Sequence, residues 1–127
     1  MRSRLPYLVL ALLWAGLIVF LSSRPGSATP PMPHPVDWVV HCGAFFGLGF
    51  LISLAIGLPR RAWMAVALVS CFGMCDEFHQ YFTPGRDCSV GDWLADTTGA
   101  TAAAIAWFLA WRQGKAVLCQ DNAHPGA

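Results

Sequence analysis

The chain has 127 residues, of which 56% are hydrophobic and 12% are charged. That charged fraction is about half the roughly 25% of soluble globular proteins, and 15 charged side chains are too few to cover the surface of so small a soluble domain. The net charge of +1 gives no sign of the clustered basic face of a nucleic-acid-binding protein. The composition therefore predicts a membrane protein with no nucleic-acid partner.

Four apolar runs separated by polar segments predict four transmembrane helices, because a bilayer core of about 30 Å needs roughly 20 helical residues. The predicted spans cover residues 5–22, 37–58, 62–82 and 90–111. The third run is uncharged only as far as Cys75, so its helix must continue through Asp76 and Glu77 toward Pro84 to cross the bilayer. We expect an all-α, polytopic bundle of four helices in a single domain over residues 1–127, with residues 113–127 as a short polar tail.

The first run has an alternative interpretation as a cleavable signal peptide. Arg2 and Arg4 precede it and the small residues Gly26-Ser27-Ala28 follow it. Its uncharged core of about 17 residues is longer than the ~7–15 residues usual for such signals. The length favours a retained helix.

The basic residues predict the orientation of the bundle through the positive-inside rule. With the amino terminus inside, the cytoplasmic side holds Arg2, Arg4, Arg60, Arg61, Arg112 and Lys115, and the outer side holds only Arg24 and Arg86. Both termini are therefore expected in the cytoplasm, with the two loops after the first and third helices outside.

Polar side chains form a stripe at the outer end of each of the last three predicted helices, at spacings of three or four residues. Arg86 is expected to pair with Glu77 or Asp92. The small residues Gly43 and Gly47, and Gly99 and Ala103, are expected to let the helices approach closely. Ser22, Ser23 and Ser89 are interpreted as turn and cap residues. The predicted polar site consists of Asp37, His41, Asp76, Glu77, His79, Gln80, Arg86, Asp92 and Asp96.

Three of these segments carry a resemblance to a known family. Asp37-x-x-x-His41, Asp76-Glu77-x-His79-Gln80-x-Phe82-x-Pro84-Gly85-Arg86 and Ser89-x-x-Asp92-x-x-x-Asp96-x-x-Gly99 resemble the VanZ-like membrane proteins, as does the turn Ser22-Ser23-Arg24-Pro25. The resemblance implies a multi-pass bundle in a bacterial cytoplasmic (inner) membrane, and the family's founding member is associated with resistance to the glycopeptide antibiotic teicoplanin. Here Trp38 stands where the family commonly has a lysine, and Asp96 stands where an asparagine is common. Both departures alter the charge balance of the site.

Three classes of function remain open. The site is expected to bind a lipid headgroup, a cell-wall precursor or an amphiphilic antibiotic at the outer leaflet, with Arg86 facing an anionic group. Alternatively it is the active site of a membrane-embedded enzyme, with Glu77 or Asp92 as general base and His41 or His79 as acid or base. In the third class the polar residues only fix the helices of a structural or accessory protein.

Neither a cofactor nor a metal is expected. His41, Glu77, His79 and Asp92 are residue types that zinc accepts, but the chain lacks His-Glu-x-x-His and Cys-x-x-Cys. The five cysteines are not expected to form disulfides, because Cys88 is the one that clearly faces the oxidising side.

Overall fold

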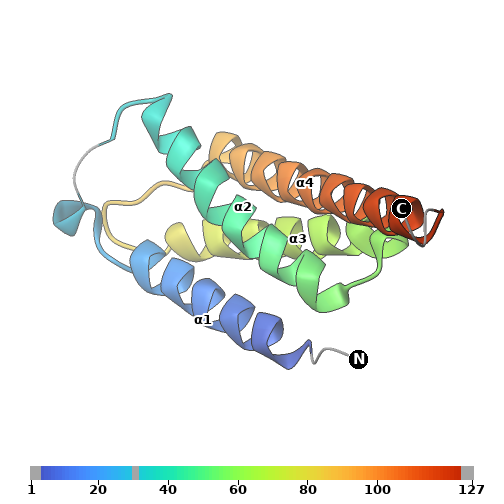
Figure 1. Ribbon diagram of the computed structural model, residues 1–127. Coiled ribbons are helices and arrows are strands. Elements are labelled where there is room, and N and C mark those ends of the chain that lie inside the picture. Colours follow the sequence, from blue (N-terminus) through green and yellow to red (C-terminus); the bar gives the residue numbers. More distant parts are fainter. Residues whose placement is uncertain (1–3, 30–31, 124–127) are drawn as a thin grey trace.

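The computed structural model describes residues 4–29 and 32–123, and for residues 116–123 it describes only the backbone. Four helices lie side by side and alternate in direction along the chain (Figure 1). They are α1 (Leu5–Ser22), α2 (Val36–Ile56), α3 (Ala62–Gln80) and α4 (Val90–Ala123), with short 3-10 turns at Gly26–Ala28 and Pro59–Arg61. The described ranges contain no strand, so the all-α prediction is confirmed.

The helix boundaries agree with the predicted runs to within two residues, except at the end of α4. That helix continues to Ala123, so most of the segment expected as a tail is helical. Gly114 in this segment is a poor helix former, but no proline interrupts the chain before Pro125, so the helix can continue. At about 1.5 Å per residue, the 34 residues of α4 extend beyond the thickness of a bilayer core.

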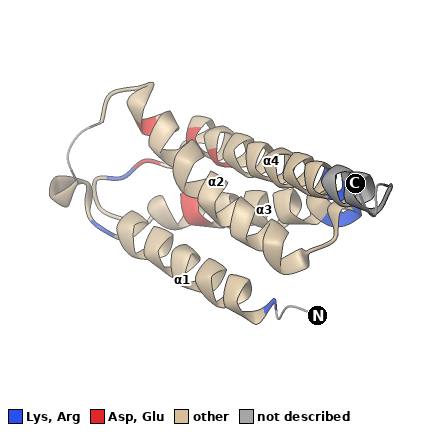
Figure 2. Ribbon diagram, viewed as in Figure 1, with Lys and Arg blue, Asp and Glu red and all other residues tan. Residues whose placement is uncertain are grey.

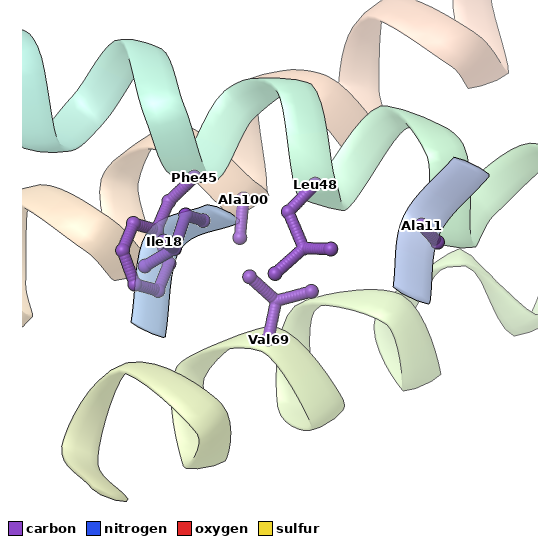
Figure 3. Close-up of a cluster of buried hydrophobic side chains, with 6 residues drawn as sticks. All are labelled: Ala11, Ile18, Phe45, Leu48, Val69 and Ala100. Atoms are coloured by element: carbon purple, nitrogen blue, oxygen red, sulfur yellow. The ribbon is translucent and has the colours of Figure 1, made fainter. Parts of the chain in front are cut away.

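The apolar core forms where all four helices meet. Phe45 and Leu48 of α2, Val69 of α3 and Ala100 of α4 are buried together with Ala11 and Ile18 of α1 (Figure 3). The close-up shows the side chains of Leu48 and Val69 facing each other between α2 and α3. Packing in this core fixes the relative positions of the helix ends, and these ends carry the polar residues.

Outside this core, the usual distribution of polar and apolar side chains is reversed. Leu13 and Phe20 of α1 are 66% and 64% exposed, whereas Glu77 and Asp96 are 3% and 0% exposed. Among the described helices, α1 and α2 are the two that are long and apolar enough to cross a membrane. Exposed apolar helices around buried carboxylates indicate a membrane protein, because a lipid environment favours this arrangement and water does not.

α2 and α4 pack more closely than the other helices, and glycines make this possible. A Cβ on Gly99 would collide with the carbonyl oxygen of Cys42, and a Cβ on Gly49 would lie 3.0 Å from Ala100 Cα. The expected role of Gly43 is wrong, since a Cβ there would meet nothing within 4 Å. Residues 42, 46 and 49 form the stripe of α2 that faces α4, and Gly43 lies off this stripe.

Candidate functional site

The acidic residues with described side chains gather at one end of the bundle, where α2 and α4 begin and α3 ends (Figure 2). Most basic residues lie at the opposite end, where Arg4 Nη1 donates a hydrogen bond of 2.6 Å to the carbonyl oxygen of Ile56. The alternation of helix direction brings the predicted stripes to this common end. The buried polar residues there are Ser22, Asp76, Glu77, Gln80, Thr83, Asp92 and Asp96.

His41, Glu77 and Asp96, from three different helices, form what we call the inner cluster. One side-chain nitrogen or oxygen atom from each of these residues lies within 4.8 Å of the corresponding atoms of the other two. His41 Nδ1 contacts Asp96 Oδ1 at 3.0 Å, and His41 Nε2 lies 3.9 Å from Asp37 Oδ1 one turn earlier on α2. The imidazole is therefore held between two carboxylates.

Gly73 provides the space in which the Asp96 carboxylate lies. A Cβ on Gly73 would be 2.9 Å from Asp96 Oδ2 and 3.0 Å from Phe45 Cε1. Because Phe45 belongs to the apolar core, the inner cluster directly borders that core. Within the described part of the chain, Asp96 Oδ2 is buried and has no hydrogen-bond partner.

A hydrogen-bonded network fixes the two carboxylates at the end of α3. Ser22 Oγ donates to Asp76 Oδ1 at 2.6 Å, and the backbone N–H of Ser89 donates to Glu77 Oε2 at 2.7 Å. Gln80 Nε2 donates to both carboxylates, to Asp76 Oδ2 at 3.2 Å and to Glu77 Oε1 at 3.4 Å. This network ties α1 and the start of α4 to the end of α3.

Next to the inner cluster, a ring nitrogen of His34 and carboxylate oxygens of Asp37 and Asp92 lie within 4.8 Å of one another. We call these three residues the outer cluster. Asp92 is 7% exposed, and its Oδ1 is buried without a hydrogen-bond partner among the described residues. His34 is exposed and Asp37 is partly exposed, so the outer cluster connects the buried carboxylates to the surface. The sequence analysis did not single out His34, since it lies in a proline-rich loop outside the predicted stripes.

Ser89 caps α4 as expected, because its Oγ accepts a hydrogen bond of 3.2 Å from the backbone N–H of Asp92. The cap fixes the first turn of α4, which carries Asp92, and the same turn presents the Ser89 N–H to Glu77. Local helix capping and the geometry of the site are therefore coupled.

The predicted pairing of Arg86 with Glu77 or Asp92 is wrong. Arg86 Nε donates to the carbonyl oxygen of Arg24 at 3.3 Å and Nη2 donates to that of Leu21 at 3.4 Å. The Leu21 carbonyl belongs to the last turn of α1, and the Arg24 carbonyl lies just after that helix. At a helix C-terminus backbone acceptors have no partner within the helix, and a cation is favoured by the helix dipole. Arg86 thus joins the loop between α3 and α4 to the end of α1 and the residues just after it, instead of neutralising a buried carboxylate.

His79 also lies apart from the inner cluster. It is exposed, and its Nε2 contacts Ser23 Oγ at 3.0 Å. The structure brings the other predicted residues together through the contacts above and leaves His79 and Arg86 at the edge. The sequence analysis missed Ser22 as a partner of Asp76; its position at the end of the first helix, level with the acidic residues, was the available signal.

The arrangement is rich in buried carboxylates and poor in buried cations. In the described segments, no lysine or arginine forms an ion pair with these carboxylates, and His41 is the basic group in contact with them. Burying carboxylates without opposite charge is costly. The site is therefore suited to a positively charged ligand or to proton exchange through the imidazole.

Among curated proteins and among solved structures, no significant match to the chain exists. A family profile described as VanZ/LLP1 matches residues 7–111, which include nearly all of α1, the whole of α2 and α3, and every residue of the two clusters. This match confirms the resemblance carried by the three motifs. The chain therefore belongs to the VanZ/LLP1 family.

Proposed function

We propose that this protein is a multi-pass protein of the bacterial cytoplasmic membrane that binds the polar head of an amphiphile at the outer leaflet. The observation that supports this role most directly is the outer cluster, which leads from the surface to the unpartnered, buried Oδ1 of Asp92. A membrane lipid, a cell-wall precursor and an amphiphilic antibiotic all present a polar head at the membrane surface.

The charges of the site favour a cationic group on that head. Asp37 is partly exposed beside the buried Asp92, and Arg86, the residue expected to hold an anion, donates to backbone carbonyls. An ammonium group can donate three hydrogen bonds and would offset the desolvation cost of Asp92. The ligand is accordingly an amphiphile with an amino group.

The orientation in the membrane follows from the same separation of charge. Arg4, Arg60, Arg61 and Arg112 belong to the end of the bundle opposite the site. Cytoplasmic loops are enriched in basic residues, so the two clusters are assigned to the outer leaflet and both termini to the cytoplasm.

Binding is tested with native mass spectrometry of the full-length protein in detergent, with phosphatidylethanolamine and phosphatidylglycerol added at equal concentrations. We expect preferential retention of phosphatidylethanolamine, which carries an ammonium group, and loss of this preference in Asp92→Asn. The matched control is Asp87→Asn, which removes the same charge from an exposed loop position. Equal retention of both lipids by the wild type, or an unchanged preference in Asp92→Asn, would contradict the proposal.

The cellular role is tested by deleting the gene in the native host and measuring lipids, cell-wall precursors and glycopeptide susceptibility together. A change in one lipid or precursor class identifies the natural ligand. Greater susceptibility to teicoplanin with unchanged lipids and precursors identifies the antibiotic as the ligand.

A second candidate function is an enzyme that uses His41 for acid–base chemistry. The supporting observation is the position of the His41 ring, with Nδ1 3.0 Å from Asp96 and Nε2 3.9 Å from Asp37. Two carboxylates on opposite sides orient an imidazole for proton transfer. Conversion of the bound amphiphile into a product of different mass, abolished in His41→Gln, distinguishes this role from binding alone.

A further inference from the structure

We propose that the inner cluster binds a divalent transition-metal ion through His41, Glu77 and Asp96. The three side chains come from α2, α3 and α4, and their donor atoms already lie within 4.8 Å of one another. Ligands about 2.0–2.2 Å from a zinc ion lie roughly 3–4 Å from one another, so side-chain movements on the order of 1 Å complete the site. This site lies deeper than the outer cluster and does not depend on the headgroup proposal.

The strongest support is the state of the Asp96 carboxylate. Asp96 is 0% exposed, its Oδ1 contacts His41 Nδ1 at 3.0 Å, and its Oδ2 has no partner in the described part of the chain. A network that only fixed the helices would satisfy both oxygens of a fully buried carboxylate. A cation bound at this carboxylate would supply the missing interaction.

The charge of the inner cluster points in the same direction. Glu77 and Asp96 together carry up to two negative charges when ionised, and His41 carries at most one positive charge. Phe45 and Gly73 border the cluster with apolar surface, so little solvent is available to stabilise the excess charge. A divalent cation neutralises both carboxylates and leaves His41 as a neutral nitrogen ligand.

Neighbouring residues restrain two of the three proposed ligands, His41 and Glu77. His41 Nδ1 faces Asp96, and Nε2 on the opposite side of the ring lies 3.9 Å from the Asp37 carboxylate. A carboxylate on that side favours the ring orientation in which Nδ1 binds the metal. Glu77 is held by Gln80 and by the backbone N–H of Ser89. These two ligands are therefore restrained by Asp37 of α2, by Gln80 of α3 and by Ser89, the residue before α4.

The donor types select the class of metal. Magnesium and calcium prefer oxygen ligands throughout, whereas an imidazole together with carboxylates suits zinc and, among metals that also accept oxygen, manganese. The three protein ligands leave coordination positions for water or for an oxygen of a bound headgroup. We therefore choose Zn²⁺ and Mn²⁺ as probes.

The test uses full-length protein that is purified in detergent, treated with a chelator and then desalted. Isothermal titration with ZnCl₂ and with MnCl₂, followed by elemental analysis after a second desalting step, is expected to give one tightly bound ion per chain. Asp96→Asn, which preserves the shape of the side chain, should remove the tight site, and Asp37→Asn should weaken it by about 10–100-fold. Asp87→Asn, in the exposed loop, should bind as the wild type does.

A spectroscopic measurement on the wild type keeps the test independent of whether the variants fold. With bound Mn²⁺, pulsed electron paramagnetic resonance should detect coupling to an imidazole nitrogen, and this coupling should disappear in His41→Gln. Absence of a stoichiometric ion in the wild type, or absence of nitrogen coupling, would overturn the metal site. No lipid is added in these experiments, so their outcome is separate from that of the headgroup test.

Discussion

His41 Nδ1 and Asp96 Oδ1 lie 3.0 Å apart and link α2 to α4 at the end of the bundle that holds the acidic residues. The two residues are 55 positions apart in the chain, and Asp96 is completely buried. The close approach of the two helices, made possible by Gly99 and Gly49, creates this contact. The geometry of the site therefore depends directly on how α2 packs against α4.

Gly99→Ala should disrupt the packing of α2 on α4. The new methyl group would collide with the carbonyl oxygen of Cys42, and since backbone cannot move aside as a side chain does, we expect the free energy of unfolding to fall by about 1–3 kcal/mol. The measurement is thermal or denaturant unfolding in detergent. Gly43→Ala is the control, because a Cβ there meets nothing within 4 Å and a helix gains about 0.5–1 kcal/mol from alanine. Equal destabilisation by both variants would contradict the packing described here.

Ser22→Ala should destabilise the protein by removing the hydrogen bond that Asp76 Oδ1 accepts. The bond is 2.6 Å long and both residues are buried, so the loss leaves a buried carboxylate oxygen without this donor and costs about 1–3 kcal/mol. Unfolding is measured beside Ser27→Ala, which changes an exposed serine in the following loop. If the two variants are equally stable, the contact between α1 and α3 contributes nothing.

Arg86→Lys should loosen the junction between the loop after α1 and the loop between α3 and α4. Lysine keeps the charge but cannot reproduce the two donors that Arg86 directs at Leu21 and Arg24. Hydrogen exchange followed by mass spectrometry should show faster exchange at the amide of Gly26, which donates to Pro84 across this junction. The control is Arg60→Lys, at the opposite end of the bundle, which should leave the exchange of the Gly26 amide unchanged. If Arg86→Lys also leaves this exchange unchanged, the role assigned to Arg86 is wrong.

The proposed topology is tested by labelling single cysteines. In intact cells, a membrane-impermeant thiol reagent should modify Cys88, which is exposed in the loop between α3 and α4, in a variant whose other cysteines are serines. The corresponding variant that keeps only Cys119 should react only after the membrane is permeabilised. The reverse pattern would place the two clusters on the cytoplasmic side.

The sequence predicted those parts of the site that depend on local periodicity. Asp37 and His41 are four residues apart, so a helix must place them on one face, and Ser89 followed by Asp92 predicts the cap that α4 has. The four apolar runs predicted the helices because composition and proline positions determine where a helix can begin and end. The three motifs were sufficient to indicate the family.

The remaining contacts were decided by packing between segments distant in sequence. The partner of Arg86, the burial of Ser22 against Asp76 and the separation of His79 from the inner cluster depend on how α1 and the two loops meet the ends of α3 and α4. Periodicity fixes the face of a helix on which a residue lies, but the rotation of each helix relative to its neighbours is set by close contacts such as those at Gly49 and Gly99. For this reason the residue types of the site can be read from the sequence, whereas the two clusters that they form exist only in the folded bundle.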